Sequence, residues 1–180
     1  MKHSVFVFII FLLISFNANA IKKSDYGSEK IAVVDVQTIL DNALAVVYIR
    51  TEVDKFNKNL QNEFLKLENN LKIKEQELIK QKDILSPDDF EKEVIKFNKN
   101  VTKAQKVIQE KKIKLEQAHA KSLSKVNNLA LKIISKLALK NKYSLVLPST
   151  QILYADEKMN ITKEVLEQLN SNLPRVELDF

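Results

Sequence analysis

Apolar residues recur at steps of three and four along about 90 residues, from Val46 to Leu137. This spacing places them on one stripe of an α-helix, and the Lys, Glu, Asn and Gln residues between them suit a solvated face. The steps follow a heptad repeat with a stutter, which is typical of a coiled coil that unwinds locally. The pattern therefore predicts long helices with one apolar seam, and so a chain with much surface and little core.

The dipeptide Ser86-Pro87 is the only expected break in this pattern. The first helix should end near Leu85, and a second should follow directly, because Ser86 is a good N-cap and Pro87 fits the first helical position. Asp88 and Asp89 would complement the positive end of the helix dipole. Two helices joined by so tight a connection lie antiparallel. At about 1.5 Å per residue the first helix would reach about 60 Å, so we predict a long helical hairpin.

Short segments near both ends of the chain have strand character. Residues 31–36 form a β-branched run of strand length, residues 143–148 are a second candidate, and residues 152–154 are a third. A final helix is expected over residues 160–170, with Thr162 as its N-cap. So few short strands cannot form a stable sheet alone. We expect them to pack on the helix bases, on sheets of other subunits, or on both.

The first 20 residues have the pattern of a secretory signal peptide. Lys2 and His3 supply the polar start, residues 5–16 the apolar stretch, and Ala18-Asn19-Ala20 a cleavage site. The apolar stretch is about a dozen residues long, which is short for a membrane-spanning helix and argues against an uncleaved anchor. We therefore expect cleavage after Ala20 and export of a mature chain that is soluble.

Composition excludes several kinds of chemistry. Cysteine is absent and Gly27 is the only glycine, so disulfides, lipid-modified cysteine and a glycine-rich phosphate loop are ruled out. His119 is the only histidine of the mature chain, and one histidine without companion ligands does not make a metal site. Asp35 follows a strand without a partner carboxylate, so we expect a cap or turn role for Asp35 and Asp156. The sequence predicts no enzyme, no cofactor and no metal.

The chain is basic, with 29 Lys and Arg against 23 Asp and Glu, and its net charge of +6 becomes +5 when Lys2 is removed. Such a balance favours acidic partners, which include anionic lipids, acidic polypeptides and nucleic acid; export argues against the last of these. Seven lysines between residues 96 and 114 form a group that we call the basic cluster, and Glu110 is the only acidic residue in this stretch. The simpler interpretation of the basic cluster is a solvated helix face. The functional interpretation is a lining that attracts acidic partners, and salt would weaken this attraction. The basic cluster consists of Lys96, Lys99, Lys103, Lys106, Lys111, Lys112 and Lys114.

Four phenylalanines lie on the apolar stripes of the predicted hairpin: Phe56, Phe64, Phe90 and Phe97. Such stripes normally pack against each other in the seam. The alternative is partial exposure along a thin arm, where the rings could contact a partner.

The two ends of the mature chain carry a recognisable pattern. Residues 31–37, followed by Ile39-Leu40, would form an opening strand and short helix, and residues 141–148 a closing strand that continues through 152–156. These segments resemble the Skp/OmpH family of periplasmic chaperones. The signal peptide, length, basic charge and strand–hairpin–strand order agree with that family along the whole chain.

The resemblance implies a mainly α fold with a small β body: a coiled-coil tentacle, residues 49–120, attached to a short-stranded trimerisation domain, residues 21–48 and 121–180. Three hairpins of a homotrimer would enclose a cavity that holds unfolded outer-membrane proteins. The protein would be an ATP-independent periplasmic holdase that prevents their aggregation during transit, with the basic cluster as client-binding residues. An anionic lipid or lipopolysaccharide surface is a further expected partner, and nucleic acid is not. The expected contacts of the body core and oligomer are Val34, Val36, Ile133, Leu137, Leu145, Leu147, Leu153 and Tyr154.

Two other functions share part of this pattern. A structural coiled-coil spacer of the cell envelope would have the heptads, but it leaves the terminal strands unexplained. A nucleic-acid-binding protein would have the basic charge, but it conflicts with the signal peptide and would need a recognition motif or an aromatic stacking surface. Binding of an unfolded barrel protein would favour the holdase over the spacer.

Overall fold

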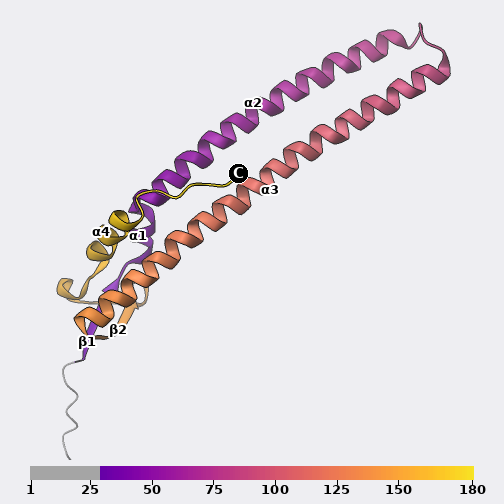
Figure 1. The fold of residues 1–180 in the computed structure, drawn as a ribbon. Coiled ribbons are helices and arrows are strands. Elements are labelled where there is room, and N and C mark those ends of the chain that lie inside the picture. Colours follow the sequence, from indigo (N-terminus) through magenta and orange to yellow (C-terminus); the bar gives the residue numbers. More distant parts are fainter. Residues whose placement is uncertain (1–28) are drawn as a thin grey trace, which may run out of the picture.

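The computed structural model describes residues 29–180, which form a long hairpin of two helices with a small body at its base (Figure 1). This is the mainly helical fold with a small β body that the sequence predicts. The expected signal peptide and its cleavage site lie outside the described residues. In chain order the elements are β1 (Lys30–Val34), α1 (Val36–Asn42), α2 (Leu44–Gln81), α3 (Pro87–Asn141), β2 (Tyr143–Pro148), the 3₁₀ helices η1 (Ser149–Gln151) and η2 (Glu157–Met159), and α4 (Thr162–Asn172).

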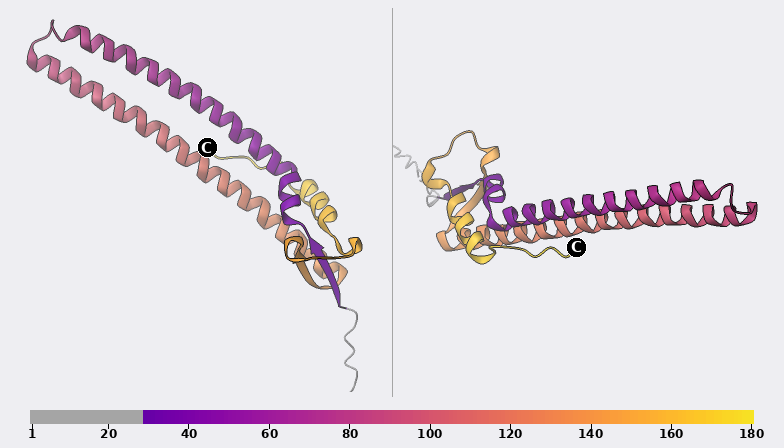
Figure 2. Two further views of the ribbon diagram at one scale, coloured as in Figure 1. Left: turned by 180° about the vertical axis from the view of Figure 1, so that it is seen from behind. Right: turned by 90° about the horizontal axis from the view of Figure 1, so that it is seen from above.

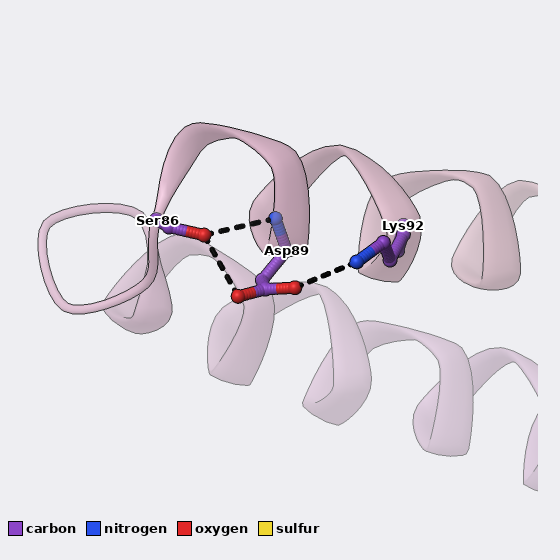
Figure 3. A network of polar contacts seen from close by, with 3 residues as sticks. All are labelled: Ser86, Asp89 and Lys92. Atoms are coloured by element: carbon purple, nitrogen blue, oxygen red, sulfur yellow. Dashed lines mark hydrogen bonds and ion pairs between the residues drawn. The ribbon is translucent and has the colours of Figure 1, made fainter.

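The second helix of the hairpin begins as predicted. The Oγ atom of Ser86 accepts a hydrogen bond from the N–H of Asp89 at 3.2 Å, and Pro87 is the first helical residue (Figure 3). The Ser86 hydroxyl also donates to Oδ2 of Asp89 at 2.7 Å, while Lys92 Nζ lies 2.8 Å from Oδ1. The N-cap is therefore one corner of a small polar network that closes the hairpin tip.

The first helix ends earlier than expected, at Gln81 instead of near Leu85. Residues 82–85 form a turn, in which the N–H groups of Ile84 and Leu85 both bond to the carbonyl of Gln81. The apolar pattern extends into this turn, but the chain has to reverse direction before the cap at Ser86. Ile84 is strongly exposed at the tip as a result.

The two strands are parallel neighbours, with Ile31 opposite Leu145. Parallel strands need a long crossover connection, and here α1, α2 and α3 supply it, so the whole hairpin is an excursion between two adjacent strands (Figure 1). Lys142 makes the return possible, because its left-handed conformation (φ 57°) ends α3 and directs the chain into β2.

The first strand ends at Val34, two residues before the expected end at residue 36. Asp35 instead caps α1, since its Oδ1 atom accepts the N–H of Thr38 at 2.9 Å. Val36 is consequently the first residue of a helix. The predicted cap role of Asp35 is confirmed, and Asp156 has the same role in η2, where it accepts the N–H of Lys158.

The prediction of a third strand at residues 152–154 is wrong. The N–H of Ile152 bonds to the carbonyl of Ser149, so the chain turns there instead of running beside the sheet. In the described chain the sheet is extended only by an isolated bridge between Val33 and Asn160.

Thr162 does not cap the final helix, as the sequence suggested, but is its first residue; the cap position is Ile161. The Oγ1 atom of Thr162 instead accepts the N–H of Asp35 at 2.8 Å, from a residue 127 positions away in the sequence. Its hydroxyl therefore fastens α4 to the end of β1.

The core of the body lies where α1, α4 and the bases of α2 and α3 meet the sheet. The largest fully buried side chains there are Ile39, Ile49, Val126, Leu137, Val165 and Leu169. After α4, the C-terminal tail (residues 173–180) leaves the body and runs along the base of the hairpin (Figures 1 and 2). The tail buries Val176 on this core.

Candidate functional site

The middle of the hairpin contains a groove between its two helices, here called the hairpin groove, with a volume of about 550 Å³. Phe64 at its edge is 49% exposed, and Leu67 and Leu71 are only partly buried. On the opposite helix the small side chain of Ala104 leaves space that a larger residue would fill. The residues lining the hairpin groove are Phe64, Leu67, Glu68, Leu71, Lys72, Glu75, Phe97, Val101, Ala104, Gln105 and Ile108.

The four phenylalanines of the stripes have different environments. Phe90 and Phe97 are partly buried, as residues of a packed seam are. Phe64 is half-exposed, which is the alternative that the sequence left open. Phe56 packs on the last residue of the chain, Phe180, with 4.5 Å between the ring centroids. The seam is thus tight at the base of the hairpin and open in its middle.

Lys111 occupies an apolar slot of the heptad pattern, and the structure gives it a partner. Its Nζ atom lies 2.7 Å from Oε1 of Glu63 on the facing helix and contacts Oε2 as well. Ile108 and Leu115 are buried on either side of it in the sequence. The ammonium group therefore bridges the two helices, and both side chains are 40% exposed.

The other lysines of the basic cluster are exposed on α3. Lys96 pairs with Glu93 at 3.3 Å and Lys106 with Glu110 at 3.8 Å, each within one turn of the same helix. Within residues 29–180 the remaining four, Lys99, Lys103, Lys112 and Lys114, form no ion pair. They do not share one face, because Lys112 and Lys114 point about 200° apart around the helix. Lys112 lines a cavity beside Leu60 and Phe64, and Lys114 lines one beside Phe180.

The expected body and oligomer residues fall into two groups. Val34, Ile133 and Leu137 are buried in the core of the single chain, and Val36 and Leu147 are partly buried. The other three are exposed apolar side chains: Leu145 on β2, and Leu153 and Tyr154 in the loop after it, of which Leu153 is fully exposed and Tyr154 is 87% exposed. These three share the part of the body that follows α3.

Two carboxyl groups have shifted acidities. The hydrogen bonds from Thr38 hold the pKa of Asp35 below its ordinary value of 3.8. The Lys92 ammonium and the Ser86 hydroxyl lower the pKa of Asp89 in the same direction. Asp35 is the N-cap of α1 and Asp89 lies in the first turn of α3, so both shifts come from local contacts at the start of a helix.

Among residues 29–180, no group of three or more His, Asp or Glu side chains is placed to hold a metal ion. The helices of this part of the chain also lack a stretch long and apolar enough to cross a membrane.

Comparison with protein families matches residues 30–169 to the family described as outer membrane protein (OmpH-like). The chain belongs to the OmpH family. A crystal structure from Caulobacter crescentus CB15, of a protein described as an OmpH-like outer membrane chaperone, shares the fold of this OmpH-family chain. Its TM-score is 0.75, and the alignment covers 84% of this chain and 89% of that one at 16% identity. No protein of curated function matched the sequence. The family match and the structural neighbour together show the OmpH family and its fold for this chain.

The sequence interpretation overlooked Glu63, and it marked residues 173–180 as a tail without a role. Glu63 could have been found by counting from the turn, because it lies 23 residues before Ser86 and Lys111 lies 25 after it. In an antiparallel hairpin such positions face each other. The tail gave a weaker signal, namely apolar residues at every second position, Val176, Leu178 and Phe180.

Proposed function

We propose that this OmpH-family protein is an ATP-independent periplasmic holdase that binds unfolded outer-membrane proteins and prevents their aggregation during transit. The observation that carries the proposal is the partly open seam of the hairpin, which offers an apolar groove far from the body. An unfolded chain can bury apolar side chains in such a groove without being held in one fixed conformation. Many weak contacts of this kind suit clients of varied sequence better than one shaped pocket does.

The charge of the hairpin supports the same function. Lys99, Lys103, Lys112 and Lys114, which form no ion pair within the described part of the chain, are exposed, and Lys112 lies beside Phe64. Long-range attraction by such groups speeds the capture of acidic segments more than it raises affinity. An anionic lipid or lipopolysaccharide surface would be attracted by the same residues.

The body supports the proposal of a homotrimer. Within the described chain the sheet has only two strands, and a sheet of that size needs further packing. Leu145, Leu153 and Tyr154 supply exposed apolar surface next to β2. A body built from residues 21–48 and 121–180 of three subunits would cover that surface, and three arms of residues 49–120 would then surround a cavity. The amino-terminal signal would direct the chain to the periplasm, with cleavage after Ala20.

The test is light scattering after dilution of a urea-unfolded outer-membrane barrel protein into buffer that contains the purified chain and no nucleotide. Suppression of scattering that saturates near one trimer per client and weakens with salt supports the holdase. Sedimentation of the chain at three times the subunit mass supports the homotrimer. Unchanged scattering with well-folded protein would reject the holdase and favour the envelope spacer.

A matched pair of variants locates the binding surface. Phe64→Ser removes a half-exposed ring from the hairpin groove, whereas Phe90→Ser removes a ring near the tip, outside that groove. If clients bind in the groove, only Phe64→Ser should raise the amount of chain needed for half-maximal suppression. Equal effects of the two variants would reject the groove as the contact surface.

A further inference from the structure

The tail is a feature of this chain beyond the OmpH family match, which ends at residue 169. It leaves α4 at Leu173, whose N–H bonds to the carbonyl of Leu169. From there it runs along one face of the hairpin, as the two views in Figure 2 show. Its position next to the base of both long helices calls for an explanation that the body fold does not provide.

The tail has the side-chain pattern of a β-strand without a sheet. Val176 is buried and Leu178 is partly buried, while Glu177 and Asp179 between them are exposed. Phe180 continues the alternation, with its ring on Phe56. In the described chain, however, residues 174–180 make no hydrogen bond and no ion pair. Beyond Leu173 the tail is therefore held only by the apolar side chains of every second residue.

The surface that receives the end of the tail has a definite chemistry. We call it the tail site and define it by Phe56 on α2 and by Lys114, Gln117, Ala118 and Lys121 on α3. The ring centroids of Phe56 and Phe180 are 4.5 Å apart with 30° between the ring planes. A cavity of about 310 Å³ beside Phe180 is bounded by the two lysines. The site thus offers an aromatic platform and the positive charge of two lysines around the cavity beside Phe180.

A permanent structural strap would be expected to have stronger attachments than these. A segment without backbone hydrogen bonds and with few buried side chains belongs to the least stable parts of a fold, which open at little cost in free energy. Phe180, the residue farthest along, is still 38% exposed. Residues 177–180 can therefore leave the tail site while Val176 stays in the core of the body.

We propose that the tail site docks an extended segment of an unfolded barrel protein, and that the chain's own tail occupies the site as an internal competitor. Strands of membrane barrels alternate apolar and polar residues with a period of two, which is the pattern of residues 176–180. The preferred segment would have apolar residues at every second position and an aromatic residue in the place of Phe180. This inference rests on the proposed function, since it names the class of client segment that is captured.

The experiment measures binding of a fluorescent peptide with the sequence of residues 172–180 to the purified full chain, by anisotropy. Phe180→Ala in the protein loosens the competitor and leaves the tail site intact, so the peptide should bind about tenfold more tightly than to the wild type. Phe56→Ala should abolish this binding, and Phe56→Leu, which keeps an apolar side chain, should weaken it. Phe90→Ala is the matched control and should change the peptide affinity less than twofold.

A second peptide of the same composition, with its apolar residues placed next to one another, should bind at least tenfold more weakly. The inference is overturned if Phe180→Ala leaves the peptide affinity unchanged, if Phe56→Ala leaves it undiminished, or if both peptides bind equally. The aggregation assay separates this result from the proposed function. Suppression of client aggregation without any peptide binding would retain the holdase and reject the tail site. Peptide binding without suppression would retain the tail site as a peptide-binding surface and reject the holdase.

Discussion

Substitution of Leu137 by alanine tests whether the body of this chain has a core of its own. Leu137 lies near the end of α3, is 2% exposed and belongs to the cluster that joins α1, α4 and the hairpin base. Removal of a fully buried leucine side chain costs about 2–5 kcal/mol, because transfer free energy is lost and a cavity remains. We expect a loss of about 3 kcal/mol in the free energy of unfolding. With a urea dependence of about 2 kcal/mol per molar, the midpoint should fall by about 1.5 M.

The assay is urea unfolding followed by circular dichroism and by tyrosine fluorescence. Tyr143 packs against the same core and reports on the body, whereas the ellipticity is dominated by the hairpin. Leu131→Ala is the control on the same helix; Leu131 is 51% exposed, and its truncation should change the free energy by no more than about 0.5 kcal/mol. A loss below about 1 kcal/mol for Leu137→Ala, or equal losses for the two variants, would refute the assignment of this core.

Three further predictions concern polar contacts. Ser86→Ala removes the cap of α3 and should cost about 1 kcal/mol, measured by thermal unfolding. Lys111→Leu alone leaves Glu63 without its partner, and it should lower the free energy of unfolding by less than about 1 kcal/mol because the pair is half-exposed. The double variant with Glu63→Leu should be more stable than the wild type. A double-mutant cycle in urea measures both effects. The folded state holds the pKa of Asp35 below 3.8, so the unfolded chain takes up this proton first as the pH falls. The stabilisation by ionised Asp35 is complete above that value and is lost as the pH falls towards the lowered pKa, and Asp35→Asn should remove this part of the acid dependence in unfolding curves recorded between pH 5 and 2.

The parts of the fold that depend on neighbouring residues could be predicted from the sequence. The heptad pattern indicated both long helices, and Ser86 with Pro87 marked the start of the second, because capping and periodicity act within a few residues. The strand at residues 31–36 was placed correctly except for its end. Asp35 has the side chain of a helix cap, and its position after an apolar run concealed that β1 stops one residue before it.

Contacts between distant residues could not be predicted in the same way. Thr162 has the side chain of an N-cap, but Asp35, 127 residues away, supplies the N–H that it accepts. The segment at residues 152–154 has apolar residues suited to a strand, yet the described chain provides no neighbouring strand for it. The hairpin groove depends on how closely two long helices approach, which their stripes alone do not specify. The tail site depends on where residues 173–180 pack after they leave α4.

The parallel pairing of β1 with β2 has a consequence for how the chain folds. Ile31 and Leu145 are adjacent in the sheet but 114 positions apart in the sequence. Closure of so long a loop is entropically unfavourable and slow when contacts between its ends have to form first. The two long helices avoid this difficulty, because pairing can begin at the Ser86 turn between nearby residues and proceed one heptad at a time towards the base. Each step shortens the remaining loop, so that the ends of the hairpin bring β1 and β2 together last. The arm is then also the template on which the body is assembled, and substitutions near the tip should slow folding even where they leave the final stability of the body unchanged.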